Sequence, residues 1–397
     1  MKPGEQKKIL ILTPRLPYPV IGGDRLRIYQ VCKALSVRFS LTLLSLCETE
    51  HEMNLEIPND GVFDRVERVL LGKTRSYINT LMAFPTSTPL QVGYYRSVAF
   101  QKAVNRLLPE HAGVLSHLIR CAEYVRHADV PKFLEMTDAI SLNYGRLNAL
   151  KGSAGLRGML YRFEAGRLNR YEKAVVSDFD LSILVSKTDR DFLIKEGYDE
   201  NILVASNGVD VSSMPFTDRR RSGSVVVYIG NMTTVQNMDA CLYFASEVLP
   251  RLSEHLDVRF RVVGRIESKD AGRLRRFAGV EVTGAVDSIA EAVRDARIGV
   301  CPVRLAAGVQ NKVLEYMALG LPVVCSTIGL EGLDAVPEHD LLVADIPSEY
   351  VQQIDRLWAD EGLRSELAKN ARSHVEVHHD WRAKLIPLVE KVAEYVG

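Results

Sequence analysis

Short apolar runs alternate with amphipathic stretches along the first half of the chain. The first run is Lys8–Thr13, and the Asp24–Ser36 stretch that follows has apolar residues at helical spacing. Similar runs recur with helical stretches between them, at Ser40–Ser45, Val66–Leu71, Gly113–Ser116, Lys132–Met136, Leu181–Val185 and Ile202–Ala205. Strands that alternate with helices predict a parallel sheet with helices on both faces.

The alternation stops at Asp210–Ser224, which contains Pro215, three consecutive arginines and Gly223, and then restarts. The later predicted strands are Val225–Ile229, Val258–Val263, Val280–Thr283, Ile298–Pro302 and Val323–Cys325. Helices are predicted at Asn237–Leu252, Ser288–Arg294 and Asn311–Leu319, and over most of Pro347–Tyr395. We therefore predict two doubly wound α/β domains, residues 1–209 and 224–375. A linker at 210–223 joins them, and a C-terminal helix at 376–397 packs back on the first domain. Ligands of such sheets bind beyond the carboxyl ends of the strands, so we expect a cleft between the domains.

Composition narrows the class of protein. A chain of 397 residues with 47% hydrophobic and 25% charged residues fits two globular cores. The 50 basic and 50 acidic side chains cancel, which disfavours a general nucleic-acid binder. Six scattered cysteines without a CxxC pair indicate a reducing compartment. The opening apolar run is too short for a secretory signal, and no run reaches about 18 apolar residues, so we expect a cytoplasmic protein.

Residues 74–101 depart from the regular pattern. Prolines, the pair Tyr94 and Tyr95, and the basic Arg75 and Arg96 share one apolar segment. Two interpretations stay open: a helical hairpin that covers the sheet, or an acceptor or membrane-surface patch.

The segment Val303–Ser326 has the features of an anion site. A predicted strand is followed by a loop of small residues ending in Gly308, and then by a helix that carries Lys312 and Glu315. Small side chains let a phosphate approach backbone N–H groups, and the helix start and Lys312 supply positive charge. Glu315 could accept hydrogen bonds from a ribose. The alternative is a tight turn with both side chains at the surface.

This segment resembles the donor-nucleotide motif of the family 4 glycosyltransferases, which have the GT-B fold of two facing Rossmann-like domains. The motif reads KVLEYMALGLPVVCS, followed by Gly329, Glu331, Gly332 and Leu333. Further matches lie in order along nearly the whole chain. They are Gly22-Gly23, LVSKTDRDFL at Leu184–Leu193, SNGVD at Ser206–Asp210, YIGNM at Tyr228–Met232, VVGR at Val262–Arg265 and VTGAV at Val282–Val286.

The resemblance implies a role for each matching residue of the donor site. Glu315 would bind the nucleotide ribose, and Gly308 with its neighbours Val309, Gln310 and Asn311 would hold the diphosphate. Gly230 would let the donor approach the second domain, and Arg265 would lie near the base. The missing Cβ atoms of Gly22 and Gly23 would allow close approach from the first domain. Lys312 and Arg265 would stabilise the departing diphosphate.

Two positions differ from the family pattern. Ala307 stands where relatives often have a glutamate that contacts the donor sugar, so Arg304 or Gln310 would compensate. Asn231 stands where many relatives have an arginine, which shifts phosphate neutralisation to Lys312, Arg265 or Arg25. Similar loops occur in the branch associated with exopolysaccharide sugar transferases.

Three residues after predicted strands of the first domain are further candidates. His117 lies where retaining members often place a histidine against the transferred sugar, and Arg120 close by is its rival. Asp138 would either contact the acceptor sugar or cap the helix Ala139–Leu147. The pair Asp178 and Asp180 could hold a metal, but it precedes a strand, away from the expected cleft, and we expect neither a metal nor a cofactor.

The sequence thus predicts a cytoplasmic glycosyltransferase, with peripheral contact to the inner face of a membrane left open. Its partners would be a nucleotide-sugar donor and a saccharide or lipid-linked acceptor, with no nucleic acid. Transfer with retention is implied by the resemblance alone. A nucleotide-sugar epimerase of similar fold and a non-catalytic nucleotide-sugar-binding protein are the alternatives.

Overall fold

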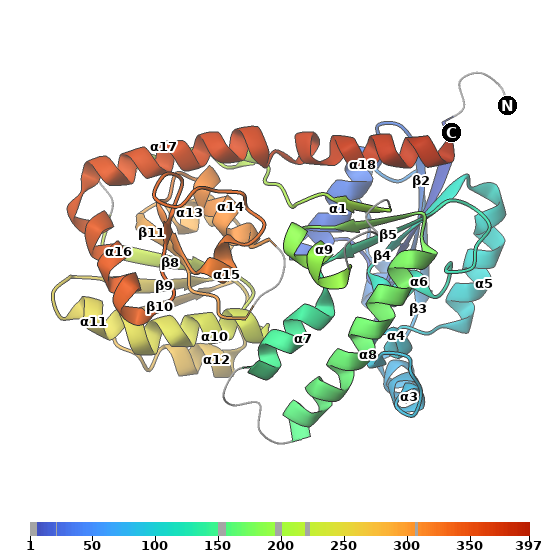
Figure 1. Ribbon diagram of the computed structural model, residues 1–397, viewed down its shortest axis with the longest axis horizontal. Coiled ribbons are helices and arrows are strands. Elements are labelled where there is room, and N and C mark those ends of the chain that lie inside the picture. The colour runs from blue at the N-terminus through green and yellow to red at the C-terminus, as the bar shows by residue number, and fades with distance from the viewer. Residues whose placement is uncertain (1–5, 21, 150–155, 195–200, 219–222, 306–308) are drawn as a thin grey trace. The chain divides into compact units, whose positions relative to one another are not determined.

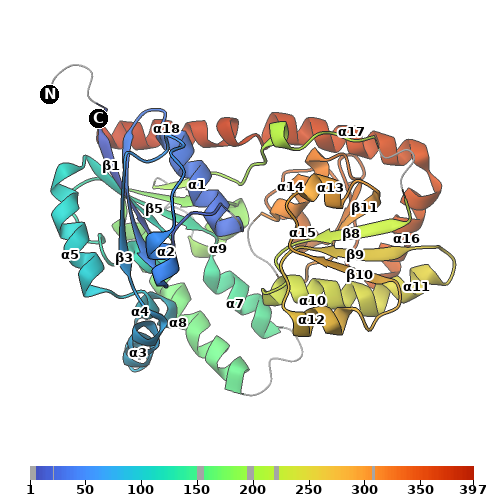
Figure 2. The same cartoon turned by 180° about the vertical axis from the view of Figure 1, so that it is seen from behind.

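A computed structural model describes residues 6–20, 22–149, 156–194, 201–218, 223–305 and 309–397. The chain divides into two compact units (Figures 1 and 2). Unit 1 comprises Met1–Ala205 together with Leu385–Gly397, and unit 2 comprises Ser206–Lys384. The last segment of the chain therefore belongs to the same unit as the first.

Unit 1 contains a seven-stranded sheet in which every described pairing is parallel. Its order is β3-β2-β1-β4-β5-β6-β7. The strands are β1 (Lys8–Thr13), β2 (Ser40–Cys47), β3 (Arg65–Leu70), β4 (Gly113–His117), β5 (Lys132–Thr137), β6 (Leu181–Leu184) and β7 (Ile202–Val204). The order reverses between β1 and β4, which is the switch point at which doubly wound sheets bind ligands.

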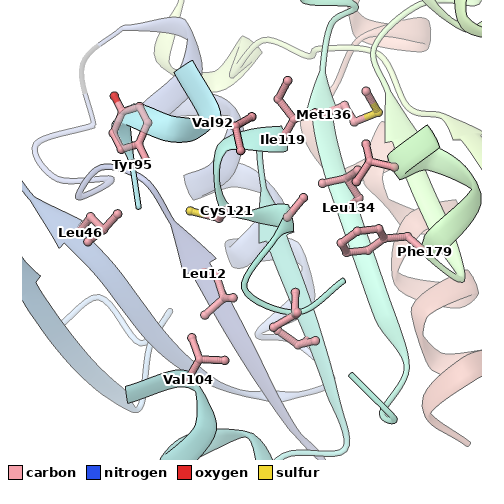
Figure 3. Close-up of a cluster of buried hydrophobic side chains, with 14 of the residues drawn as sticks. Leu12, Leu46, Val92, Tyr95, Val104, Ile119, Cys121, Leu134, Met136 and Phe179 are labelled. Atoms are coloured by element: carbon pink, nitrogen blue, oxygen red, sulfur yellow. The ribbon is translucent and has the colours of Figure 1, made fainter. Parts of the chain in front are cut away.

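Helices connect and flank these strands. They are α1 (Gly23–Leu35), α2 (Glu50–Asn54), α3 (Lys73–Ala83), α4 (Leu90–Tyr94), α5 (Val98–Leu107), α6 (Ile119–Ala122), α7 (Ile140–Ala149), α8 (Leu156–Asp178) and α9 (Lys187–Leu193). Because parallel strands are covered on both faces, β1 and β2 are rich in apolar residues and are almost wholly buried. Figure 3 shows part of the resulting core, in which side chains of β1 and β5 meet Val92 and Cys121 from the connecting helices.

Unit 2 repeats the arrangement with a six-stranded parallel sheet of order β10-β9-β8-β11-β12-β13. Its strands are β8 (Val225–Ile229), β9 (Arg259–Val263), β10 (Val280–Gly284), β11 (Ala296–Cys301), β12 (Val323–Cys325) and β13 (Leu342–Val343). The helices are α10 (Val235–Tyr243), α11 (Leu249–Ser253), α12 (Ser268–Leu274), α13 (Ile289–Ala292), α14 (Asn311–Ala318), α15 (Thr327–Leu330), α16 (Pro347–Ala359) and α17 (Glu361–His378). The switch point lies between β8 and β11.

The prediction of a two-unit, doubly wound α/β fold is confirmed. The division falls after Ala205, before the linker that we predicted at 210–223. Helix α17 continues to His378, and a separate helix, α18 (Trp381–Val396), carries the chain from unit 2 into unit 1.

Candidate functional site

The switch point of unit 1 places His117 at the last position of β4, as the sequence predicts. Its side chain is buried, and its Nδ1 lies 2.6 Å from Oε2 of Glu135 on the neighbouring strand β5. The other carboxylate oxygen, Oε1, accepts a hydrogen bond from Nε of Arg27 on α1 at 3.1 Å. Both Arg27 and Glu135 are fully buried. The three side chains form one buried chain, Arg27–Glu135–His117, that ends at the carboxyl edge of the sheet.

The charge of Glu135 determines how His117 is presented. Burial alone would raise the pKa of Glu135, but the His117 hydrogen bond and the Arg27 charge outweigh it and lower the pKa to about 2. The carboxylate is therefore ionised at neutral pH and can only accept hydrogen bonds. His117 must carry its proton on Nδ1, which leaves Nε2 as the ring atom available to a ligand.

Backbone conformation is unusual on both sides of this pair. Leu118, directly after His117, has φ of 61°, and Thr137, two residues after Glu135, has φ of 67°. Non-glycine residues rarely adopt positive φ, and a β-branched residue such as Thr137 does so least readily. Strained backbone of this kind gathers at functional sites. Here it marks the carboxyl ends of β4 and β5.

Asp138 follows β5 at the same edge, but the helix cap predicted for it is supplied by other residues. The N–H of Ala139 donates to Asp189, and the N–H groups of Ile140 and Ser141 donate to Glu172. The predicted capping by Asp138 is therefore wrong, because two acidic side chains of α8 and α9 already satisfy these donors. The Asp138 carboxylate accepts from Asn143 Nδ2 instead.

Asp138 also lies close to other acidic side chains. Burial, together with the nearby charges of Asp189 and Glu172, raises its pKa to about 7, and the Arg120 charge opposes this rise. A half-buried carboxyl with a pKa near neutrality can exchange a proton at physiological pH.

A cavity of about 340 Å³ lies within unit 1 beside these strand ends. Arg15, which follows β1, and Arg120, which follows β4, both line it. Nε of Arg15 donates to the Tyr95 hydroxyl at 3.1 Å, and the Arg120 guanidinium lies over the Tyr95 ring, 5.4 Å from its centre. Nε of Arg120 donates to the amide oxygen of Gln91 at 3.2 Å. These hydrogen-bond and ring partners are all neutral, and both arginines line the cavity.

The lining of the cavity also contains a buried acid, Glu164, that lies next to an arginine. Glu164 accepts a hydrogen bond from the N–H of Leu90 at 2.5 Å, and Arg167 lies 3.7 Å from its other oxygen. The cavity is therefore positively charged, partly aromatic, and large enough for a saccharide or a phosphorylated sugar.

The first glycine of the pair after β1 has a backbone conformation that favours glycine. Gly22 precedes α1 with φ of 97° and ψ of 155°, a conformation open essentially to glycine alone. Gly23 is the first residue of α1. Arg25 in the first turn is paired with Glu52 at 3.3 Å, so it is less available for a phosphate than predicted.

In unit 2 the predicted anion site is the start of α14. Ala307 and Gly308 lie outside the described residues, while Val309 is buried and Gln310 occupies the position before the helix without a side-chain cap. Asn311 Oδ1 accepts a hydrogen bond from Nδ2 of Asn207 at 2.7 Å. The SNGVD segment therefore braces the first residue of the helix, and the Gln310 side chain does not cap it.

Lys312 and Glu315 lie one turn apart on α14. Lys312 is buried, its Nζ donates to the Gln310 amide oxygen at 3.1 Å and lies 5.3 Å from the centre of the Tyr228 ring. Burial raises the pKa of the half-buried Glu315 to about 7, and the Lys312 charge opposes the rise. The sequence left open a tight turn with Lys312 and Glu315 both at the surface. The burial of Lys312 contradicts that alternative for this residue.

Tyr316 fixes α14 to the switch point of the sheet. Its buried hydroxyl accepts from the N–H of Ile229 at 2.7 Å, at the end of β8. Next to it, Gly230 and Gly264 bring two strand ends into close contact: a Cβ on Gly264 would lie 2.0 Å from the Gly230 carbonyl oxygen. Gly264 also has φ of 129°. Glycine at position 264 is therefore required by both space and conformation.

Two arginines of unit 2 that we predicted as site residues differ in whether their side chains are free to bind a ligand. Arg265, just past β9, is exposed, and its backbone carbonyl accepts from the N–H of Met232. Arg304 is bound to Asp239 through two hydrogen bonds of 2.6 and 3.1 Å, and it stacks on Tyr243. Arg304 is therefore committed to a neighbouring carboxylate.

The pair Asp178 and Asp180 lies before β6, at the amino edge of the sheet. Asp178 pairs with Arg126 at 2.6 Å, and Asp180 accepts from the N–H of Lys132 at 2.8 Å. Within the described ranges, no group of three or more His, Cys, Asp or Glu side chains is arranged to hold a metal ion.

Several contributors were missed at the sequence level. Glu135 gave the clearest overlooked signal, because a lone acid inside the apolar strand KFLEMT is rarely buried without a partner. Arg27 lies among apolar residues on the inward face of α1 and could have been proposed as that partner. Arg15 gave no local signal, because only the folded chain brings it to the cavity. Tyr95 and Asn207 lie in segments that the sequence analysis singled out, but their contacts with Arg15 and Asn311 depend on the fold.

Comparison with known proteins gives one sequence match and many structural ones. Residues 223–360 match the family model described as "Glycosyl transferases group 1". No curated protein matches the chain in sequence. Sucrose-phosphate synthase from Thermosynechococcus elongatus aligns with a TM-score of 0.73 at 15% identity, covering 98% of this chain and 99% of that one.

Two further structures were determined with ligands. HepE from Anabaena, in complex with UDP and glucose, aligns with a TM-score of 0.69 at 15% identity and covers 98% of this chain and 100% of its own. A mutant of TarM from S. aureus, in complex with UDP, fondaparinux and α-GlcNAc-glycerol, aligns with a TM-score of 0.66 at 11% identity. The alignment covers 98% of this chain and 100% of that one. The chain therefore has the two-unit α/β fold of GT-B proteins, and its residues 223–360 are similar in sequence to group 1 glycosyl transferases.

Proposed function

We propose that this protein is a glycosyltransferase that moves a sugar from a nucleotide-diphosphate sugar to a saccharide or lipid-linked saccharide. The observation that carries the proposal is the start of α14, where the positive end of the helix, Lys312 and Glu315 come together within the segment similar to group 1 glycosyl transferases. The finer assignments to family 4 and to exopolysaccharide synthesis rest on the sequence motifs.

The donor would bind to unit 2. Positive charge at the helix start and on Lys312 suits a diphosphate, and Glu315 suits the two hydroxyls of a ribose. Sugar transfer develops positive charge on the ring and negative charge on the departing diphosphate. Lys312 and the α14 N–H groups would stabilise that negative charge, with the exposed Arg265 as a further cation. No metal ion is needed in this scheme.

The transferred sugar would be oriented by His117. Because Glu135 holds the proton of His117 on Nδ1, its Nε2 would accept a hydrogen bond from a sugar hydroxyl. The protein would supply positioning and charge rather than a nucleophile, consistent with retention at the anomeric carbon.

The acceptor would bind in the cavity of unit 1. Arg15 and Arg120 suit an acceptor that carries phosphate or carboxylate groups, and the Tyr95 ring offers an apolar surface beside them. Asp138, with a pKa of about 7, is the candidate to receive the proton of the acceptor hydroxyl. We place the reaction in the cytoplasm, at the inner face of a membrane where the acceptor is lipid-linked.

Thermal unfolding in the presence of UDP-, GDP- and ADP-sugars tests the donor assignment. UDP comes first, because the HepE and TarM structures contain it. A ligand at about 100 times its Kd stabilises the folded protein by roughly 2.7 kcal/mol. Glu315→Ala should remove the shift, whereas Glu366→Ala, on the exposed side of α17, should keep it.

Product analysis separates transfer from the alternatives. Release of nucleotide that depends on an added acceptor supports transfer, and the anomeric configuration of the product reports retention. Conversion of the donor without an acceptor would indicate an epimerase. Nucleotide binding without release, from any donor and acceptor tried, would indicate a binding protein. Binding of none of the sugar nucleotides would refute the proposal.

A further inference from the structure

Helix α3 has its polar and apolar sides reversed relative to an ordinary surface helix. It packs against α4 (Figure 1) through Ser76, Asn79 and Ala83, which are buried. Asn79 Nδ2 donates to the backbone carbonyl of Arg96 at 2.8 Å. Ala83 lies so close to Gly93 that a Cβ on that glycine would be 2.5 Å away. Small and polar residues therefore form the inward side.

Large apolar residues form the outward side. Tyr77, Ile78, Leu81 and Met82 are 62%, 44%, 74% and 67% exposed. Phe84, just past the helix, is 53% exposed, and it stacks 5.4 Å from Phe163 of α8, which is 46% exposed. We call these six residues the apolar face. A contiguous group of exposed apolar side chains of this kind marks a surface that binds a membrane or another molecule.

The sequence segment that carries α3 and α4 contains basic but no acidic residues. No acidic residue occurs in the sequence between Glu67 and Glu110. The same stretch contains Lys73 and Arg75, both exposed in the first turn of α3, and the exposed Arg96. An apolar surface bordered by basic residues fits the boundary between anionic headgroups and acyl chains.

We infer that the apolar face of α3 docks the protein on the surface of an anionic lipid bilayer. The helix would lie in the plane of the interface, since none of the helices in the described part of the chain is long and apolar enough to cross a membrane. Tyr77, Ile78, Leu81 and Met82 would enter the acyl boundary, and Lys73 and Arg75 would contact lipid phosphates. The inference stands on the surface of unit 1 and does not require the donor chemistry.

A second copy of the chain is a poorer occupant. In a two-fold dimer the same surface meets itself, so the basic residues of α3 would face those of the other copy. An anionic surface complements them. The acceptor cavity supports the same orientation, because Thr80 of α3 and Arg120 both line it. If the proposed function holds, a phosphate linked to a membrane lipid could enter the cavity from the docked side.

Vesicle flotation tests the inference with the full-length protein. We expect binding to vesicles of phosphatidylcholine with about 30% phosphatidylglycerol at 0.1 M salt, and at least tenfold weaker binding to pure phosphatidylcholine or at 0.5 M salt. The double variant Leu81→Ser/Met82→Ser should bind at least tenfold more weakly than wild type. Lys73→Gln/Arg75→Gln should weaken binding to anionic vesicles only.

The matched control is Val336→Ser/Val377→Ser, which removes two exposed apolar side chains from unit 2 and should leave vesicle binding unchanged. Thermal unfolding and UDP binding of all variants should equal those of wild type, because none of the changed residues lines the cavity or α14. Failure of wild type to float, or equal flotation of the Leu81/Met82 variant, would overturn the inference. So would a dimer in sedimentation velocity that this variant abolishes. Loss of UDP binding alone would count against the transferase and not against membrane docking.

Discussion

At the scale of single residues, the pKa of a buried or half-buried glutamate shifts in opposite directions in the two units. Glu135 lies between Arg27 and His117, and these partners lower its pKa to about 2 despite burial. Glu315 has only the Lys312 charge opposing burial, and its pKa rises to about 7. Glu135 is therefore a permanent charge that orients a neighbour, whereas Glu315 changes charge near neutral pH.

Glu135→Gln should impair both stability and transfer. The substitution leaves the Arg27 charge buried without its carboxylate, which costs about 3 kcal/mol in the free energy of unfolding. It also frees the Nδ1 proton of His117 to move to Nε2. Urea unfolding and the transfer rate measure the two effects.

A companion variant separates these effects. Arg27→Met/Glu135→Leu removes both charges and should recover most of the stability, because apolar replacement of a buried ion pair is often neutral. Its transfer rate should stay at least tenfold below wild type, with nucleotide binding unchanged. A double variant that is both stable and fully active would show that the carboxylate does not position His117.

Nucleotide binding should depend on pH through Glu315. With a pKa of about 7, the side chain is mostly neutral at pH 6 and mostly ionised at pH 8. If the ionised carboxylate accepts the ribose hydroxyls, the Kd for UDP should be roughly tenfold higher at pH 6 than at pH 8. Calorimetry at both values measures this. Glu315→Gln should remove the Glu315 contribution, and whatever slope remains belongs to the nucleotide phosphate. An unchanged slope would contradict the assignment.

At the scale of elements, the start of α7 is held by carboxylates from two other helices. Glu172 of α8 accepts from Ile140 and Ser141, and Asp189 of α9 accepts from Ala139. Such long-range capping cannot be predicted from sequence, since Asp138 is the local residue with capping character. It makes the order of α7 depend on the packing of α8 and α9.

Glu172→Gln should flatten the pH dependence of unit 1 stability. Burial raises the pKa of Glu172 to about 7, above the value of about 4.3 expected when unfolded. The native state therefore holds the proton more tightly. Its contribution is complete below about pH 4.3 and is lost as pH rises through 7. Wild type should lose on the order of 1–3 kcal/mol more than the variant between pH 5 and pH 8, by urea unfolding. Glu366→Gln serves as the exposed control, and equal slopes for all three proteins would contradict the prediction.

The elements themselves were largely predictable, and the exceptions have physical reasons. Buried strands such as β1 and β8 are continuous apolar runs and were found at the predicted positions. The helix predicted at Asn237–Leu252 is instead α10, a π-helical turn at Phe244–Val248 and α11. Pro250 cannot donate a backbone hydrogen bond, so the ladder changes pitch ahead of it. Strand β13, Leu342–Val343, was too short to give a pattern.

At the scale of the whole molecule, the two ends of the sequence belong to the same unit. The chain leaves unit 1 at Ala205 and returns to it at Leu385. The returning segment is part of the core of unit 1: Leu388 and Val392 are buried, and the Tyr395 ring packs 6.0 Å from Phe133 of β5. Sequence periodicity predicted the helix, but the identity of the unit that it completes depends on contacts remote in sequence.

This arrangement predicts that a change near the C-terminus weakens the unit that contains the N-terminus. Leu388→Ala removes a fully buried side chain and should destabilise unit 1 by about 2–5 kcal/mol. In unit 2, Leu367→Ala on α17 is the matched change, since that side chain is also buried. Differential scanning calorimetry with and without UDP distinguishes the two, because UDP bound at α14 should raise only the transition of unit 2. Leu388→Ala should lower the transition that UDP leaves unchanged, and Leu367→Ala should lower the one that UDP raises. If both variants lower a single common transition to the same extent, the two units unfold together, and the return of α18 to unit 1 has no separate effect on its stability.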